Sequence, residues 1–184
     1  MEKIKSQVTE LLVNSRGAEG ISFRPLTIED AEDVYDMFSQ DEVFEQTHWR
    51  PASMEETHRL VRTWLAEKTE VHLVVEHEGQ TRGIFRMNAF SPEKREIWLS
   101  LIIIKPGYQN RGLGAAATRQ AAAALEASGM FDRMLLGVDA ESKAAVKCFK
   151  KAGFRITERT TKRYSNVKRP VKRFIMTLRF ATER

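Results

Sequence analysis

The sequence predicts a single domain of mixed α/β class, in which helices flank a central sheet that is mostly antiparallel. The length of 184 residues suits one domain with its own hydrophobic core. Residues 71–76, 83–90 and 96–104 have the composition of strands and are joined by tight turns at 78–80 and 91–94, which indicates an antiparallel meander. Segments with helical spacing of apolar residues precede and follow this meander.

The first 20 residues are predicted to form an N-terminal extension, and residues 21–184 form the domain itself. Ile4, Val8, Leu11 and Leu12 recur at helical spacing, and the glycines and charges of residues 16–20 then end the pattern. We therefore expect a helix here, either loosely attached to the domain or packed on a partner.

A strand and a helix are predicted next. Residues 21–24 have the pattern of a short strand that Pro25 ends, and Thr27 and Asp30 have the spacing of a capping box. The helix that follows places one apolar face inward, formed by Ala31, Val34, Tyr35 and Phe38.

A loop is predicted over residues 40–51, and it contains Phe44, His48 and Trp49. Ser53 and Glu56 repeat the capping box and open a second helix. The inward face of that helix is predicted to be Thr57, Leu60, Val61, Trp64 and Leu65.

The segment after the meander continues to alternate strands and helices. Ile102, Ile103 and Ile104 are apolar on both faces, as a central strand covered by helices requires. The predicted elements are an alanine-rich helix over 115–127 ended by Gly129, a strand over 134–138, a helix from Ser142 to Gly153, and strands over 154–161 and 174–178 across the loop 164–170.

The segment Gln109-Asn110-Arg111-Gly112-Leu113-Gly114 joins the last strand of the meander to the alanine-rich helix. The first N–H groups of a helix lack intrahelical partners and carry partial positive charge, so a glycine loop here can cradle an anion such as a pyrophosphate. A P-loop is excluded because no Gly-Lys-Ser/Thr follows. Residues 112–117 fit the dinucleotide pattern G-x-G-x-x-A, but the polar segment 105–111 separates the first glycine from the strand.

Three stretches in sequence order resemble motifs of the GNAT N-acetyltransferase superfamily. Residues 106–114 are similar to its acetyl-coenzyme A loop, Q/R-x-x-G-x-G/A with a P-x-Y-Q lead-in. Residues 142–154 resemble its N-x-x-A-x-x-x-Y-x-K-x-G-F segment, and residues 23–31 its opening strand and first helix. The resemblance covers roughly residues 21–180. It implies a GNAT-like domain whose fourth and fifth strands splay apart, nearest in look to the branch that acetylates ribosomal-protein N-termini.

The resemblance implies a binding site for acetyl-coenzyme A. Backbone groups at Ile102, Ile103 and Ile104 would hold the pantetheine arm, with an N–H there facing the oxyanion of the reaction. Ser142 and Phe149 would contact the cofactor from the second motif. The loop residues implied to bind it are Gln109, Asn110, Arg111, Gly112, Leu113, Gly114 and Ala115.

The resemblance does not supply a complete set of catalytic groups. The family's usual general acid is a tyrosine, and Phe149 stands at that position, so the general acid is unknown. An amine with a pKa of about 10 is mostly protonated at pH 7, so a base or a water relay must remove a proton. Glu96 is the predicted base, with Glu42 and Glu45 as rivals. Cys148 is interpreted as inert packing.

The region that borders the acceptor site in the resembled family is the loop 40–51. Phe44 and Trp49 would then help to bind the acceptor, or they simply cover the core, and both interpretations stay open. The four histidines do not have the spacing of a metal site, so no metal is expected.

The formal net charge is +5 and is unevenly distributed. Residues 150–184 carry twelve Lys or Arg and two Asp or Glu, a balance of +10, so the other 149 residues sum to −5. This basic end would attract an anionic cofactor, an acidic acceptor or RNA, or it is simply a solvated face. Contact with nucleic acid or the ribosome has no supporting motif.

Composition bounds the location and the partners. The single cysteine forms no internal disulfide, and no long apolar span or signal peptide is evident. We therefore expect a cytoplasmic protein without membrane contact, as a monomer or a homodimer.

Three functions are compatible with these features. The first is an N-acetyltransferase that moves an acetyl group from acetyl-coenzyme A to a primary amine (a protein N-terminus, a lysine or a small amine) by direct attack in a ternary complex. The second is a coenzyme A-binding sensor or scaffold with little catalysis, which Phe149 and the basic end would suit. The third, a nicotinamide-dependent oxidoreductase, is disfavoured by the position of the glycine loop.

Overall fold

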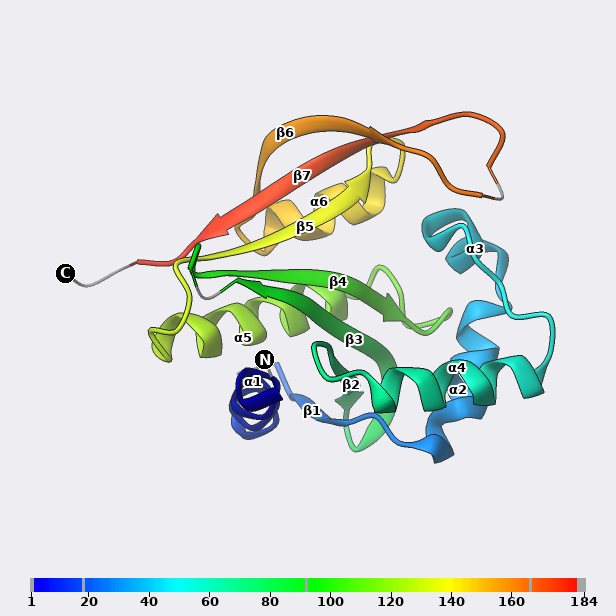
Figure 1. Ribbon diagram of the computed structural model, residues 1–184, viewed down its shortest axis with the longest axis horizontal. Helices are drawn as coiled ribbons and strands as arrows, with labels where there is room; N and C mark the ends of the chain where they lie inside the picture. Colours follow the sequence, from blue (N-terminus) through cyan, green and yellow to red (C-terminus); the bar gives the residue numbers. More distant parts are fainter. Residues whose placement is uncertain (1, 18, 92, 166, 182–184) are drawn as a thin grey trace.

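The sheet of the computed structural model, which describes residues 2–17, 19–91, 93–165 and 167–181, has seven strands in the order β1-β2-β3-β4-β5-β7-β6 (Figure 1). β4 and β5 pair in parallel, and every other neighbouring pair is antiparallel. The strands are β1 (Ile21–Pro25), β2 (Val71–His77), β3 (Gln80–Ser91), β4 (Glu96–Ile104), β5 (Arg133–Asp139), β6 (Arg155–Lys162) and β7 (Val171–Arg179). The predicted mixed, mostly antiparallel sheet is confirmed.

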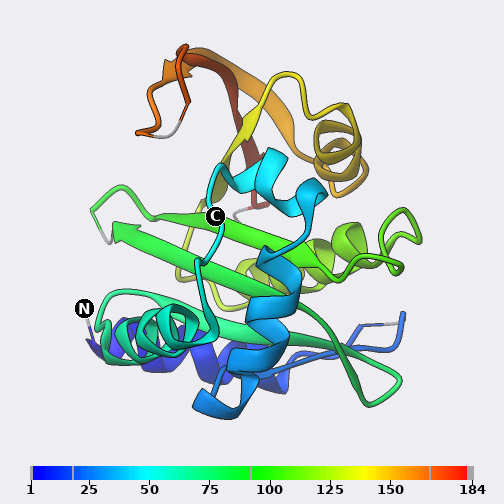
Figure 2. The ribbon, with the colours of Figure 1, turned by 90° about the vertical axis from the view of Figure 1, so that its right-hand side faces the viewer.

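Helices cover both faces of the sheet. α1 and α5 pack on one face together with α6, whereas α2 and α4 pack on the other (Figures 1 and 2). The helices are α1 (Glu2–Asn14), α2 (Ala31–Phe38), α3 (Asp41–Thr47), α4 (Met54–Ala66), α5 (Leu113–Ala127) and α6 (Lys143–Lys151), with a 3-10 turn at Ile28–Asp30.

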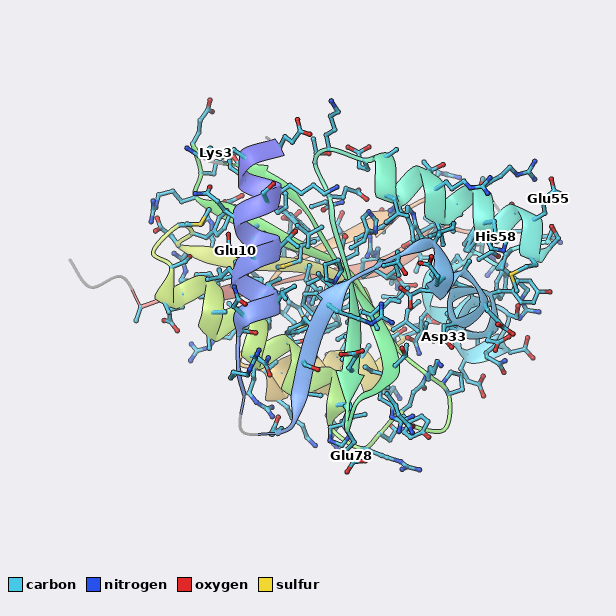
Figure 3. The ribbon with its side chains drawn as sticks, turned by 90° about the horizontal axis from the view of Figure 1, so that it is seen from below. Lys3, Glu10, Asp33, Glu55, His58 and Glu78 are labelled. Atoms are coloured by element: carbon cyan, nitrogen blue, oxygen red, sulfur yellow. The ribbon has the colours of Figure 1, made fainter. Side chains whose placement is uncertain are left out.

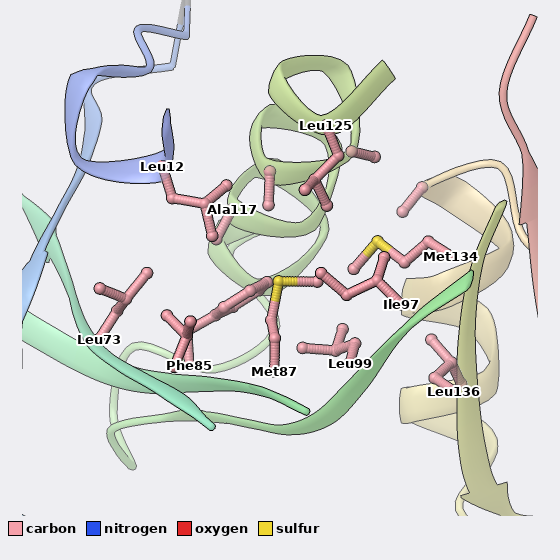
Figure 4. Close-up of a cluster of buried hydrophobic side chains, with 14 of the residues drawn as sticks. Leu12, Leu73, Phe85, Met87, Ile97, Leu99, Ala117, Leu125, Met134 and Leu136 are labelled. Atoms are coloured by element: carbon pink, nitrogen blue, oxygen red, sulfur yellow. The ribbon is translucent and has the colours of Figure 1, made fainter. Parts of the chain in front are cut away.

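Strand alternation divides the core into two apolar clusters. The larger cluster packs Leu73, Phe85 and Met87 against Ala117 and Leu125 of α5 (Figure 4). The smaller cluster places Val74, Ile84 and Ile103, which lie on the opposite face of the same strands, against α2 and α4. The central strands are therefore apolar on both faces, as the isoleucine run of β4 predicts.

The sheet opens between β4 and β5. Parallel pairing runs from Glu96↔Arg133 to Leu99↔Leu136 and then stops, so the remaining residues of both strands diverge (Figure 1). On its other edge β4 stays paired with β3, with a register shift in which Arg86 pairs with Leu101 and Met87 with Leu99. The extra residue, Ser100, is the bulge at which β4 bends away from β5. The expected splay is confirmed.

The first helix is more firmly attached than the sequence predicts. α1 forms within residues 1–20, and its Val8 and Leu12 are fully buried in the larger cluster against α5 and β1. Three of its charged residues, Glu2, Lys3 and Glu10, are exposed, and Figure 3 shows Lys3 and Glu10 on the outer face. The helix is amphipathic and uses its apolar stripe within this chain.

Two local predictions are wrong. Residues 41–47, predicted as loop, form α3, which begins with the acidic pair Asp41 and Glu42 and ends where His48 adopts a left-handed φ of 56°. Only Val43 of this helix is buried, so it gives almost no periodic signal. In α4, Thr57, Val61 and Trp64 are buried as predicted, but Leu65 is 40% exposed, because it lies one position beyond the inward stripe.

Candidate functional site

The splay exposes backbone groups of β4. The N–H of Lys105 donates to the carbonyl of Arg82 at 2.7 Å, so the backbone of residue 105 faces the β3 side. Successive strand residues turn their N–H and C=O to opposite edges, so Ile104 and Ile102 present theirs toward the splay. The Ile104 carbonyl accepts a 3.0 Å bond from Nε2 of Gln109. No β5 residue pairs with Ile102, so its backbone groups face the opening.

A cleft of about 460 Å³ extends from this opening along the glycine loop. We call it the glycine-loop cleft. It is lined by Gln46, Ile102, Ile104, Tyr108, Gln109, Asn110, Gly112, Leu113, Gly114, Ala115, Ala144, Ala145, Lys147, Cys148, Phe149 and Lys151. β4, the loop, α5 and α6 therefore contribute to one continuous surface.

The glycine loop presents unpaired N–H groups to this cleft. Gly112 is the N-cap of α5 with a φ of 89°, a conformation that costs a side-chain-bearing residue energy. In the described chain, the N–H groups of Leu113, Gly114 and Ala115 have no backbone acceptor, and the first helical bond runs from Ala116 to the Gly112 carbonyl at 2.9 Å. A Cβ on Gly114 would lie 3.3 Å from Sγ of Cys148, so glycine keeps the cleft open there.

Basic side chains surround the outer end of the loop. A pocket of about 580 Å³ includes Arg82, Arg111, Arg119 and Lys151. The guanidinium groups of Arg82 and Arg111 lie 3.9 and 5.2 Å from the ring centroid of Tyr108. The sequence predicts Tyr108 as a packing residue, and here it aligns two cations beside the loop. The combination of unpaired N–H groups and cations fits an anion such as a pyrophosphate.

A second cavity, of about 400 Å³, lies on the α2–α4 side of the splay. We call it the aromatic cavity, because Phe38, Trp49 and Trp64 form one of its walls. Trp49 meets Phe38 edge to face at 5.1 Å between ring centroids. Trp49 therefore packs on the core and also lines this cavity, whereas Phe44 is not among the residues that line either cavity.

A polar cluster lies at the end of β5, where Asp139, Arg173 and Tyr164 line the aromatic cavity and His48, which is bonded to Asp139, does not. Oδ2 of Asp139, at the end of β5, lies 2.6 Å from Nε2 of His48, and its Oδ1 lies 3.1 Å from Nε of Arg173. The ring of Tyr164 lies 4.5 Å from that of His48, and burial raises the pKa of the Tyr164 phenol. Figures 1 and 2 show α3 beside the loop that joins β6 and β7, where these groups meet. Sequence reasoning missed this cluster.

The two cavities adjoin at the splay. Gln46, Ile102, Ala145 and Phe149 line both of them. Phe149, which is only 8% exposed, lies at the junction together with the free backbone groups of Ile102. Ser142 lines the aromatic cavity and is the N-cap residue of α6, without a side-chain capping bond. The residues predicted to bind the cofactor are thus brought together in the glycine-loop cleft, with three exceptions. Ile103 and Ser142 line the aromatic cavity, and Arg111 lines the basic pocket.

The predicted base lies elsewhere. Glu96 is at the closed end of β4, where its carboxylate pairs with Arg133 of β5, and it lines neither cavity. Glu42 and Glu45 are exposed on α3 and do not line them either. Burial raises the pKa of the Cys148 thiol, which keeps it protonated and weakly reactive.

Two absences hold for the described residues. In this part of the chain, no three His, Cys, Asp or Glu side chains lie close enough together to hold a metal ion. Among the described helices, none is both long enough and apolar enough to cross a lipid bilayer.

Comparison with known structures identifies this fold. A spermidine N-acetyltransferase from Vibrio cholerae, in complex with coenzyme A and spermine, superposes with a TM-score of 0.75 at 18% identity, over 87% of this chain and 95% of the other. An acetyltransferase of the GNAT family from Bacillus anthracis gives 0.74 at 14% identity, over 89% and 96%. An aminoglycoside acetyltransferase in complex with coenzyme A gives 0.70 at 15% identity, over 86% and 94%.

Comparison of the sequence with family models assigns the chain to a family. No curated protein matches the chain significantly. A family model described as an acetyltransferase (GNAT) domain matches residues 21–155, more than half of the chain. The chain therefore belongs to the GNAT acetyltransferase family, whose members transfer an acetyl group from acetyl-coenzyme A to an amine.

Proposed function

We propose that this enzyme acetylates the primary amine of an acceptor by direct attack on acetyl-coenzyme A in a ternary complex. The observation that carries this proposal is the junction of the two cavities at Phe149 and Ile102. A donor in the glycine-loop cleft and an acceptor in the aromatic cavity would meet at one point of the splay. Neither has to leave before the other reacts, so no acyl-enzyme is needed.

The donor side is built for a long anionic molecule. The N–H groups of Leu113, Gly114 and Ala115 would bind the pyrophosphate, and Lys147 and Lys151 line the same cleft. The free N–H and C=O of Ile102 would bind the amide groups of the pantetheine arm as an added strand would. Gln109 already holds the Ile104 carbonyl, so this side chain keeps the edge of β4 in position. Acetyl-coenzyme A supplies the activated acetyl thioester.

Proton transfer is assigned to the polar cluster of the aromatic cavity. The acceptor ammonium must lose one proton before its nitrogen attacks the thioester carbon. As the carbon–sulfur bond then breaks, the leaving thiolate takes a proton from the proposed donor, and the nitrogen gives up its second proton to that donor through water. Asp139 lines the cavity and its carboxylate lies 2.6 Å from the imidazole of His48, so we assign this pair the removal of the proton, directly or through water. Glu96 is not kept in this role, because the closed end of β4 separates it from the splay.

The phenol of Tyr164 is the proposed proton donor to the leaving thiolate. Of the three tyrosines, it is the one that lines the aromatic cavity. Its raised pKa keeps the hydroxyl protonated at neutral pH. Phe149 fills the position of the family's usual acid and contributes shape only.

Titration calorimetry with acetyl-coenzyme A, followed by initial rates of thiol release with varied amine, tests this proposal. Intersecting double-reciprocal lines are expected for a ternary complex. Parallel lines would point to an acyl-enzyme and overturn direct attack. Tight binding without turnover across protein N-termini, lysine peptides and small amines would favour the sensor instead.

A further inference from the structure

We propose that the acceptor is a small zwitterion, an apolar amine that also carries a carboxylate, and not a polycation. This inference rests on the proposed function, because it names the acceptor of that reaction. It is drawn from the charges and shape of the aromatic cavity.

The charged groups that line the aromatic cavity are mostly cations. They are Arg86, Lys162 and Arg173, against the single carboxylate of Asp139. Arg173 and Asp139 neutralise each other at 3.1 Å. Arg86 has only a longer ion pair, 3.8 Å from Glu70, which does not line the cavity, so Arg86 and Lys162 supply the remaining positive charge of the lining. Polyamines and aminoglycosides carry several positive charges, and a cavity of this sign repels them.

Arg86 is the group best placed to bind an anion. Its Nε donates to Oγ of Ser100 at 3.0 Å, which fixes the plane of the guanidinium. Its nearest carboxylate, Glu70, lies 3.8 Å from Nη1, too far for a hydrogen bond. Within the described chain no acceptor bonds either terminal nitrogen, so the two can form the paired hydrogen bonds that guanidinium makes with a carboxylate.

The surroundings of Arg86 specify the body of the ligand. The guanidinium lies 5.9 Å from the ring centroid of Trp64, and Leu60 and Phe38 line the same part of the cavity. A flat apolar group would pack here beside the carboxylate. The cavity volume of about 400 Å³ suits a ligand the size of an amino acid and its near relatives.

The opposite wall fits the amine. Asp139 and Tyr164 line the cavity, with His48 bonded to Asp139. Lys162 and Arg173 lie beside them, so this wall suits the amine in the uncharged form that attacks the thioester. The zwitterion would thus span the cavity, with its carboxylate at Arg86 and its amine at the polar cluster.

The basic end of the chain adds a longer-range attraction. Lys162 lies at the end of β6 with its Nζ 4.9 Å from the ring centroid of Tyr164, and no carboxylate of the described chain lies within ion-pair distance of it. Lys162 and Arg173 are the two cations of the basic end of the chain that line the cavity. Such a field draws anionic groups toward the site.

The test compares matched amines in the thiol-release assay. One pair is phenylalanine against phenethylamine; a second is 6-aminohexanoate against hexylamine, with glycine, β-alanine and 4-aminobutyrate to measure the preferred spacing. We expect kcat/KM to be at least about tenfold higher for the carboxylate member of the preferred pair, the factor expected of one charge-assisted hydrogen bond. Spermidine and kanamycin should react at least about tenfold more slowly.

Variants of Arg86 identify the group responsible. Arg86→Gln should reduce the ratio of kcat/KM between the carboxylate-bearing amine and its matched plain amine to about one, with unchanged affinity for acetyl-coenzyme A. Arg86→Lys should keep part of this preference for the carboxylate-bearing amine. Arg62→Gln, on the exposed face of α4, is the matched control and should keep the full preference. If Arg86→Gln fails to fold, the rates of the wild type with the matched amines and those of Arg86→Lys still show whether the acceptor carboxylate binds at Arg86.

The outcomes separate this inference from the proposed function. Acetyl-coenzyme A binding with equal or faster turnover of spermidine would overturn the zwitterion alone. Binding with no turnover of any carboxylate-bearing amine would also overturn it. Failure to bind acetyl-coenzyme A would overturn the proposed function, and this inference with it.

Discussion

Nε2 of His48 lies 2.6 Å from Oδ2 of Asp139, a residue 91 positions further along the chain. The same carboxylate contacts Arg173 of β7. One buried aspartate, at the end of β5, therefore joins the residue that follows α3 to strand β7. Changing it should affect the fold and the reaction together.

Asp139→Asn should destabilise the protein by about 1–3 kcal/mol, because it leaves Arg173 without its anion in a largely buried site. For a domain of this size, that corresponds to a fall in Tm of roughly 2–12 °C. The transfer rate should fall by about tenfold or more, since the carboxylate–imidazole pair is lost. Thermal unfolding and thiol release measure the two effects.

The matched control for this prediction is Asp132→Asn. Asp132 also pairs with an arginine, Arg95, at 2.8 Å, but both side chains are 44% exposed. Its loss should cost less than about 1 kcal/mol and leave the rate unchanged. Equal effects of the two substitutions would contradict the role given to Asp139.

Gly112→Glu should abolish acetyl-coenzyme A binding. The position has a positive φ and open space for a Cβ, so the strain of about 1 kcal/mol is tolerable. A carboxylate beside the unpaired N–H groups would compete with a pyrophosphate and repel it. Calorimetry with acetyl-coenzyme A gives the readout.

Gly129→Glu is the control for the glycine loop. Gly129 also has a positive φ and an open Cβ position, but it follows the other end of α5. It should bind acetyl-coenzyme A normally. A folded Gly112→Glu variant with wild-type affinity would remove the loop from the donor site.

Cys148 should react slowly with iodoacetamide at pH 7.5 and more slowly still when acetyl-coenzyme A is bound. Burial raises the pKa of its thiol, so little thiolate is available, and the side chain lines the glycine-loop cleft. Mass spectrometry is unambiguous, because the chain has one cysteine. Unchanged labelling at saturating acetyl-coenzyme A would place the donor elsewhere, and Cys148→Ala should retain transfer.

Tyr164→Phe should lower kcat by about tenfold or more and leave the affinity for acetyl-coenzyme A unaltered, because it removes the proposed proton donor. Phe149→Tyr should not raise the rate of the wild type. If adding Phe149→Tyr to Tyr164→Phe restored kcat, position 149 would still be able to supply the general acid, as in the rest of the family. Steady-state rates of the three variants decide between these outcomes.

Stability should fall as the pH drops from 6.5 to 4, in part because of His72. Burial lowers its pKa to about 4 from the ordinary 6.5. The folded protein thus binds this proton less tightly than the unfolded chain, so the contribution is present above pH 6.5 and is lost toward pH 4. His72→Phe keeps a ring beside Trp64, whose ring centroid lies 5.3 Å from that of His72 in the wild type. This substitution should flatten the pH dependence of the unfolding free energy measured in urea. The same slope in both proteins would exclude His72 as its source.

The donor side of the site could be predicted from sequence because its parts are local. The strand, the glycine loop and the start of α5 are consecutive in the sequence. Glycine is favoured where the backbone needs a positive φ, so the glycines of the loop can be recognised from one sequence. The buried strands and the capping boxes are signalled in the same way.

The polar cluster could not be predicted, because its members are far apart in sequence. His48 follows a helix that buries only Val43, and Asp139 is one more polar residue at a strand end. The position of Glu96 at the closed end of β4 could not be predicted for a related reason. Its partner, Arg133, is set by the parallel register of β4 and β5, and register between distant strands cannot be read from spacing along the chain.

The donor side is encoded almost entirely by one continuous stretch, from β4 to α6, whereas the aromatic cavity shares β4, β5 and α6 with it and adds residues of α2, α3, α4, β3 and the β6–β7 loop. Two parts of one gene can therefore diverge at different rates. Substitutions in α2, α4 and β3, which supply the aromatic wall and Arg86, would exchange one acceptor for another without disturbing the chemistry of acetyl transfer. A chain of this design can acquire a new substrate while keeping its old cofactor.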